Sequence, residues 1–98
     1  MKKLFQQLNK AFENKIRLGT MSVLLANDKA SFNNLKDLLE VTDGNLASHL
    51  KYLEKEGYIS VQKSFIDRKP NTIYAITETG RVEFAKHLDA LESILKQR

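Results

Sequence analysis

The chain has 98 residues, 42% of them hydrophobic and 29% charged, with a formal net charge of +4. This length and balance predict one folded domain over residues 1–98 and exclude extensive disorder. The absence of cysteine excludes disulfides and thiolate metal sites. No apolar run approaches the ~20 residues that cross a bilayer, so we expect a cytoplasmic protein without membrane contact.

The positive charge flanks the middle of the chain. Residues 1–30 hold six Lys or Arg against two Asp or Glu, and residues 57–76 hold three against one. Residues 31–56 hold three against five, so the middle is acidic. A mild basic excess suits a polyanionic partner such as nucleic acid, and its distribution indicates which segments would supply the attraction.

Hydrophobic spacing predicts three helices before residue 41. Residues 2–13 form one amphipathic helix, and Asn14 is an N-cap for a second, central helix that ends at Asn27-Asp28-Lys29. Ser31 caps a third helix, which ends near residues 40–41.

A fourth helix is expected over about residues 43–56. Thr42 is its N-cap, and Gly57 supplies the left-handed position just after it. Its apolar side chains recur at spacings of four and three and define one buried face: Leu46, Leu50 and Leu53.

The period then changes from helix to strand. Ile59 and Val61 alternate with Ser60 and Gln62, which predicts a strand, and residues 71–76 are a second strand. A turn at residues 66–70 with a basic tip joins the two. Thr77 caps a last helix. The expected fold is mainly α with a small β-hairpin: a winged helix-turn-helix, with the hairpin over about residues 59–76 as the wing.

The fourth helix is the candidate DNA-reading element. A short turn before it predicts a steep crossing that projects the helix outward, and its outer positions are short or hydrogen-bonding, as entry into a major groove requires. The alternative is an ordinary surface helix of a bundle. The candidate DNA-binding residues here are Thr42, Asp43, Gly44, Asn45, Ser48, His49, Lys51 and Tyr52.

The hairpin supports a DNA-binding role for the fourth helix, because it places cations directly after that helix. The candidate DNA-binding residues of the wing are Lys63, Arg68, Lys69 and Asn71. The alternative is an ordinary solvated loop, which turn composition alone also permits.

These segments resemble a known family. Residues 35–59, with the run Ser48-His49-Leu50-Lys51-Tyr52-Leu53 at their centre, and the junction Ile76-Thr77-Glu78-Thr79-Gly80-Arg81 look like MarR/ArsR-like winged-helix transcriptional regulators of the compact, single-domain type. The resemblance runs from about Asn14 to Leu95. It implies a homodimer on a pseudo-palindromic DNA site, with the recognition helix in the major groove and the wing over the adjacent minor groove or backbone.

Two departures from that family limit what the resemblance implies. The thiolate metal-sensing motif of many ArsR-type proteins is absent, so metal sensing is not expected. The long additional dimerisation helices of full MarR proteins are also lacking, which puts their ligand pocket in doubt.

The terminal helices, residues 1–13 and 78–98, are the candidate dimer interface, because their apolar stripes exceed what one thin domain easily buries. The alternative is packing of the first helix on the last within one chain. The candidate interface residues are Leu4, Phe5, Leu8, Phe12, Phe84, Leu88, Leu91 and Leu95.

No constellation of residues indicates catalysis, a cofactor or a metal. Two histidines, His49 and His87, are too few for a zinc site, and no nucleophile–base pair appears. We therefore expect a homodimeric regulator of double-stranded DNA, acting as a repressor, with no cofactor and no enzymatic activity. The alternative function is a protein-interaction module on a winged-helix scaffold, which the acidic middle segment keeps open.

Overall fold

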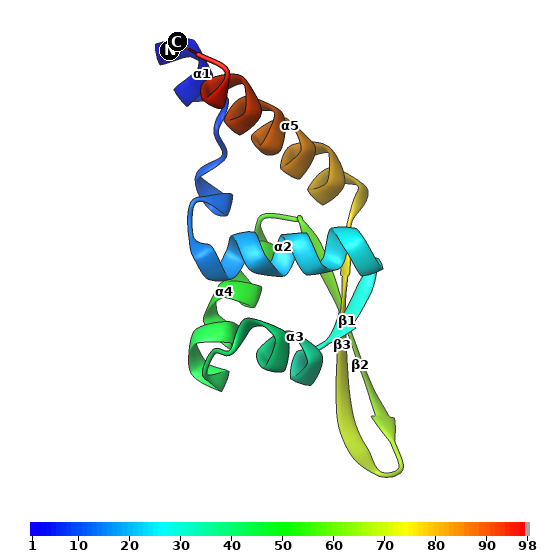
Figure 1. Ribbon diagram of the computed structural model, residues 1–98. Helices are drawn as coiled ribbons and strands as arrows, with labels where there is room; N and C mark the ends of the chain where they lie inside the picture. Colours follow the sequence, from blue (N-terminus) through cyan, green and yellow to red (C-terminus); the bar gives the residue numbers. More distant parts are fainter. Residues whose placement is uncertain (98) are drawn as a thin grey trace.

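The computed structural model describes residues 1–97, and its elements follow the expected order with one added strand (Figure 1). Within that range they are α1 (Lys2–Gln7), the short 3-10 helix η1 (Lys10–Phe12), α2 (Lys15–Asn27), β1 (Lys29–Ser31), α3 (Phe32–Leu39), α4 (Asp43–Lys55), β2 (Ile59–Ile66), β3 (Lys69–Ile76) and α5 (Glu78–Leu95). The predicted winged helix-turn-helix is therefore confirmed.

Side-chain caps start four of the helices where the sequence places them. Each cap oxygen accepts a hydrogen bond from a backbone N–H of the first helical turn, which would otherwise lack a partner. The caps are Asn14 on α2, Ser31 on α3, Thr42 on α4 and Thr77 on α5. At the other end of α4, Gly57 has a φ of +80° and the Tyr58 N–H donates to the Leu53 carbonyl at 3.0 Å, as the predicted left-handed termination requires.

The prediction of one helix over residues 2–13 is wrong in its extent, because Asn9 interrupts the helix. Asn9 Oδ1 caps η1 through the Ala11 N–H at 2.9 Å, its backbone N–H donates to His87 Nδ1 at 2.9 Å, and its Nδ2 donates to the Tyr58 hydroxyl at 3.0 Å. These tertiary contacts hold Asn9 outside any helix. Helical spacing alone gives no sign of them.

The sheet has three strands rather than the two predicted. The order is β1-β3-β2, all antiparallel, and β1 pairs Lys29, Ala30 and Ser31 with residues 73–75 of β3. The expected break in the chain at residues 27–29 is real, but it leads directly into this short strand.

The hairpin turn is shorter than expected. It consists of Asp67 and Arg68 alone, both with positive φ, and β2 and β3 are paired from Ile59↔Ile76 out to Ile66↔Lys69. Positive φ at both central residues marks the two-residue type I′ turn, which lets the strands pair up to the residues that flank the turn. The wing is therefore a ribbon that extends as a paired ladder to its tip.

The core lies where α2, α4 and the sheet meet, and it extends to η1 and α5. Leu46, Leu50 and Leu53 of α4 are at most 1% exposed, as their spacing predicts. Phe12 and Phe84 are each 1% exposed, with ring centroids 5.1 Å apart in an edge-on arrangement. Their assignment to a dimer interface is wrong, because both side chains are covered within one chain.

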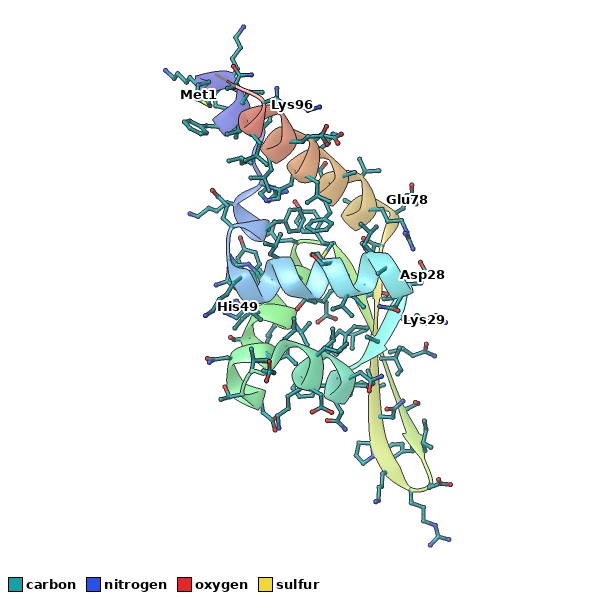
Figure 2. All side chains as sticks on the ribbon, in the orientation of Figure 1. Met1, Asp28, Lys29, His49, Glu78 and Lys96 are labelled. Atoms are coloured by element: carbon teal, nitrogen blue, oxygen red, sulfur yellow. The ribbon has the colours of Figure 1, made fainter. Side chains whose placement is uncertain are left out.

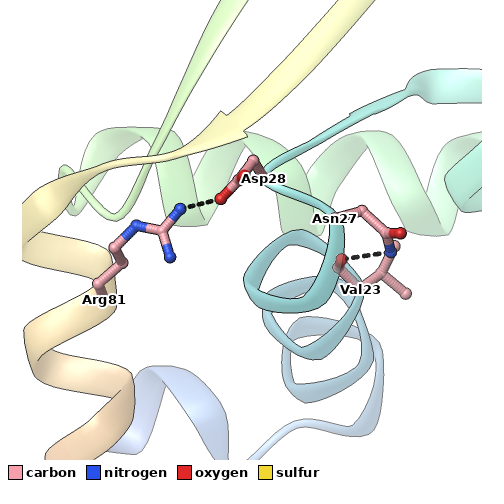
Figure 3. A network of polar contacts seen from close by, with 4 residues as sticks. All are labelled: Val23, Asn27, Asp28 and Arg81. Atoms are coloured by element: carbon pink, nitrogen blue, oxygen red, sulfur yellow. Dashed lines mark hydrogen bonds and ion pairs between the residues drawn. The ribbon is translucent and has the colours of Figure 1, made fainter.

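The molecule is elongated, with principal extents of 56 × 25 × 21 Å. Figure 1 shows the hairpin projecting from one end, while α1 lies beside the end of α5 at the other. Arg81 near the start of α5 donates a hydrogen bond to Asp28 just after α2, a contact between α5 and the body of the molecule (Figure 3). Within α2, Asn27 donates to the Val23 carbonyl. No helix in residues 1–97 is long and apolar enough to cross a membrane.

Candidate nucleic-acid interface

The helix α4 presents an outer stripe of small, polar or basic residues. Its inner face is fixed by three buried leucines, so positions half a turn away point outward from the body. Gly44, Ser48, Lys51 and Lys55 occupy that outward stripe at spacings of four and three, and all four are exposed. This stripe lets the helix surface approach a partner closely while still offering hydrogen bonds and charge.

Gly44 has no structural task within the chain. A Cβ atom built on it would meet nothing within 4 Å. Glycine in a helix costs up to about 1 kcal/mol relative to alanine, and the open space beside Gly44 leaves room for the close approach of a partner.

The negative charge of Asp43 at the start of α4 is partly balanced by a lysine of the same chain. Lys36 Nζ of α3 lies 2.7 Å from Asp43 Oδ1, and this contact raises the pKa of Lys36. Both side chains are largely exposed, so the pair contributes little stability. It does remove part of the repulsion that an exposed Asp43 would exert on a phosphate.

His49 and Tyr52 face a side of α4 that borders α2. Arg17 of α2 lies against both: its Nη1 is 3.0 Å from His49 Nδ1, and its guanidinium carbon lies 4.1 Å from the centre of the Tyr52 ring. Figure 2 shows His49 beneath the start of α2. Burial, and then the positive charge of Arg17, lower the pKa of His49, so the imidazole is neutral at pH 7.

The wing carries its cations on different faces of the ribbon. Lys63 is on the face that turns toward α4, where Ala47, Lys51 and Glu54 of α4 and Val61 and Tyr74 of the hairpin complete a shallow groove of about 260 Å³. By the alternation of strand side chains, Lys69 and Asn71 lie on the opposite face, and Arg68 is in the turn itself. Lys63, Arg68 and Lys69 are exposed, whereas Asn71 is half-buried.

Tyr74 closes the inner end of that groove. Its pKa is raised by burial and then by the nearby negative charge of Glu54. Tyr74 is therefore an uncharged phenol that can donate a hydrogen bond, beside a carboxylate that would oppose an approaching phosphate. The positive surface of the groove is thus confined to Lys51 and Lys63.

The structure leaves most of the predicted helix residues exposed. Thr42, Asp43, Gly44, Asn45, Ser48, Lys51 and Tyr52 are exposed, while His49 is partly buried against α2. Sequence reasoning missed Arg17 and Lys55. Lys55 could have been found by extending the outward spacing of Gly44, Ser48 and Lys51 by one turn, but no local pattern places Arg17 beside α4.

No group of His, Cys, Asp and Glu side chains able to hold a metal occurs in the part of the chain that the structure describes. His87 is 3% exposed, and its Nδ1 accepts a hydrogen bond from the Asn9 N–H. It is a buried structural histidine packed beside Phe12 and Phe84.

The helix α4 has a small, polar outer stripe, follows α3 after a short turn, and is flanked by a basic hairpin. This arrangement defines a winged helix-turn-helix protein. Residues 16–95 match the family model described as "Winged helix DNA-binding domain". The chain therefore belongs to this family of DNA-binding proteins. This membership confirms the expectation that the protein is not an enzyme.

Similar proteins agree with this assignment. An uncharacterized protein of Methanocaldococcus jannaschii is 39% identical over 79 residues, which is 81% of this chain and 86% of that protein. The structure of a transcriptional regulator homologue from Pyrococcus horikoshii superposes with a TM-score of 0.88 at 34% identity, covering 97% of this chain and 95% of that one. The expected resemblance to winged-helix transcriptional regulators is confirmed.

A further similar structure is the S. aureus MepR–DNA complex, with a TM-score of 0.74, 18% identity, and coverage of 97% of this chain and 77% of that chain. At this identity the likeness shows the fold alone. The function of a DNA-binding transcriptional regulator rests on the family match and on the Pyrococcus homologue.

Proposed function

We propose that the protein is a homodimeric repressor that binds a specific double-stranded DNA site, with α4 in the major groove and the wing over the adjacent minor groove or backbone. The observation that carries this proposal is the outward stripe of α4, where Gly44, Ser48 and Lys51 are exposed beside a projecting basic hairpin. A helix needs such a surface to enter a groove about 12 Å wide.

Specificity and affinity come from different parts of this surface. Asn45 and Ser48 are short hydrogen-bonding residues that suit contacts with base edges, whereas Lys63, Arg68 and Lys69 suit phosphates. Three phosphate contacts per protomer correspond to a slope of log affinity on log salt of roughly −2 to −3. DNA binding of this kind would place the protein in the cytoplasm.

The dimer would form through α1 and α5. These helices pack on each other within the chain and still leave apolar side chains exposed: Phe5 is 56% exposed, Leu88 39%, Leu91 37% and Leu95 83%. Leu4 and Leu8 are half-buried at the same end. A two-fold axis through this end would set two α4 helices about 34 Å apart, one turn of DNA.

Selection of bound sequences from a random duplex library tests the proposal. We expect a pseudo-palindrome with half-sites about one helical turn apart. Ser48→Ala should relax the preference at one position of each half-site by about 1–3 kcal/mol, while Lys86→Ala on α5, remote from α4, should leave it unchanged. Wild-type protein that binds no duplex at low salt would overturn the proposal and favour a protein-interaction module.

Sedimentation tests the dimer separately. The double variant Leu88→Glu/Leu91→Glu should sediment as a monomer and lose most of its affinity for a full site while retaining its circular dichroism. A wild-type chain that is monomeric at micromolar concentration would refute the dimer without refuting DNA binding.

A further inference from the structure

The tip of the wing carries a large exposed aromatic side chain. Phe65 is 76% exposed, and among the large apolar residues of the described chain only Leu95 is more exposed. Such exposure of a phenyl ring has no stabilising role in the folded chain, because burying apolar surface is what favours folding. Its position leaves the ring available to a partner.

The side of the ribbon on which Phe65 lies is defined by the strand register. Phe65 pairs with Pro70, and Lys63 and Val61 precede it at alternate positions on the same face. That face lines the groove beside α4, as Lys63 and Val61 show. The neighbouring apolar residue Ile66, which is 56% exposed, points to the opposite face.

The two strands that hold Phe65 are paired along their whole length. Ladder pairing continues past Phe65 to Ile66↔Lys69, and a two-residue turn closes it. Pro70, the partner of Phe65, has a fixed φ and adds a second apolar ring to the same face. A stiff support matters because a side chain can act as a wedge only if its backbone resists the opposing force.

The charges around Phe65 identify the partner. Lys63 lies two residues before Phe65 on the same face, Arg68 is in the adjoining turn, and Lys69 is on the opposite face of the ribbon. Asp67 is the one acidic residue over residues 59–76. An apolar side chain flanked by cations complements a groove whose walls are phosphates and whose floor is stacked bases.

We propose that Phe65, backed by Pro70, inserts as an apolar wedge at a base step of the minor groove and kinks the bound DNA. This inference rests on the proposed DNA-binding function and adds to it a deformation of the site, with selectivity for an easily unstacked pyrimidine–purine step beneath the wing. Apolar side chains inserted in this way unstack a base step and bend the duplex toward the major groove.

The test uses the full-length protein and a duplex taken from the selected sequences, with 2-aminopurine placed at successive steps under the wing and a fluorophore at each end. The wild-type chain should raise 2-aminopurine emission at one step and shorten the end-to-end distance. Phe65→Ala should abolish both signals and weaken binding about tenfold, in the range of losing one aromatic–base contact, with an unchanged salt slope. Phe65→Leu should restore part of both signals.

Ile66→Ala is the matched control, because it removes an exposed apolar side chain from the same tip on the opposite face; it should leave both signals intact. Wild-type binding without 2-aminopurine emission or shortening would overturn the wedge while leaving the proposed function standing. A change in oligomeric state of Phe65→Ala without DNA, with DNA geometry unaltered, would also overturn it and make the patch a self-association surface. Absence of any duplex binding would instead overturn the proposed function.

Discussion

Arg17 Nη1 lies 3.0 Å from His49 Nδ1, joining α2 to the middle of α4. Because a guanidinium only donates, His49 Nδ1 is the acceptor and the imidazole proton is on Nε2. The Arg17 Nε also donates to the Ala11 carbonyl at 2.6 Å, so the guanidinium is held from a third segment of the chain. Arg17 therefore positions α4 from its side, through His49 and the Tyr52 ring.

Arg17→Ala should raise the pKa of His49 toward its ordinary value, because the neighbouring positive charge that lowers it is lost. We also expect a loss of stability of about 1.5–3 kcal/mol, because the hydrogen bonds from the charged guanidinium to His49 and to the Ala11 carbonyl are lost. Titration of the His49 ring protons by NMR measures the first effect and urea unfolding the second. An unchanged His49 pKa would mean that the two side chains do not meet in solution.

Gly44→Ala should separate stability from DNA binding. The new methyl group meets nothing in the chain, and alanine is favoured over glycine in a helix, so unfolding should cost up to about 1 kcal/mol more. Affinity for the selected duplex should fall if α4 approaches DNA closely at this point. Thermal melts and a DNA-binding titration of the same preparation measure the two effects. Equal or tighter DNA binding by Gly44→Ala would contradict a close approach of α4 to DNA at Gly44.

Local signals in the sequence were enough to predict much of this molecule. Ser31, Thr42, Thr77 and Gly57 mark helix ends through hydrogen bonds with residues close in the chain, which makes their roles readable. The outward face of α4 followed from the leucine spacing for the same reason.

The features that escaped prediction depend on contacts between distant segments. Asn9 ends the first helix because His87 and Tyr58 hold it, and those partners are 78 and 49 residues away. The strand β1 exists because β3 offers it an edge, and Phe12 is buried because it meets Phe84. Periodicity reports which side of an element is apolar, but it does not report which neighbour covers that side.

A substitution in the wing turn should also change protein stability and DNA affinity in opposite directions. Arg68 has a φ of +67°, a backbone conformation that costs a non-glycine residue roughly 1 kcal/mol. Arg68→Gly should therefore raise the melting temperature while weakening binding to all duplexes alike and reducing the salt slope by about 1. Arg68→Lys, which keeps the charge, is the control and should keep the slope. A specific change in sequence preference would show that Arg68 contacts bases instead.

His87 should make stability depend on pH. Burial lowers its pKa, with the charge of Glu13 opposing in part, so the folded chain resists a proton that the unfolded chain accepts near pH 6.5. Above that pH both states hold neutral His87 and the residue has no effect. As pH falls below it, the free energy of unfolding should decrease, and this contribution should level off once pH passes the lower pKa of the folded state.

Urea unfolding of the wild-type chain and His87→Gln between pH 5.5 and 7.5 measures this dependence. The variant should show a flatter slope of unfolding free energy against pH, whatever its absolute stability. Some slope should remain, because the pKa of His49 is lowered in the same direction; His49→Gln removes that part and leaves the part due to His87. Protonation would also cost the bond from the Asn9 N–H to His87 Nδ1, so the amide of Asn9 should lose protection from hydrogen exchange over the same pH range. Parallel slopes for the wild-type chain and His87→Gln would contradict the buried, neutral state of His87.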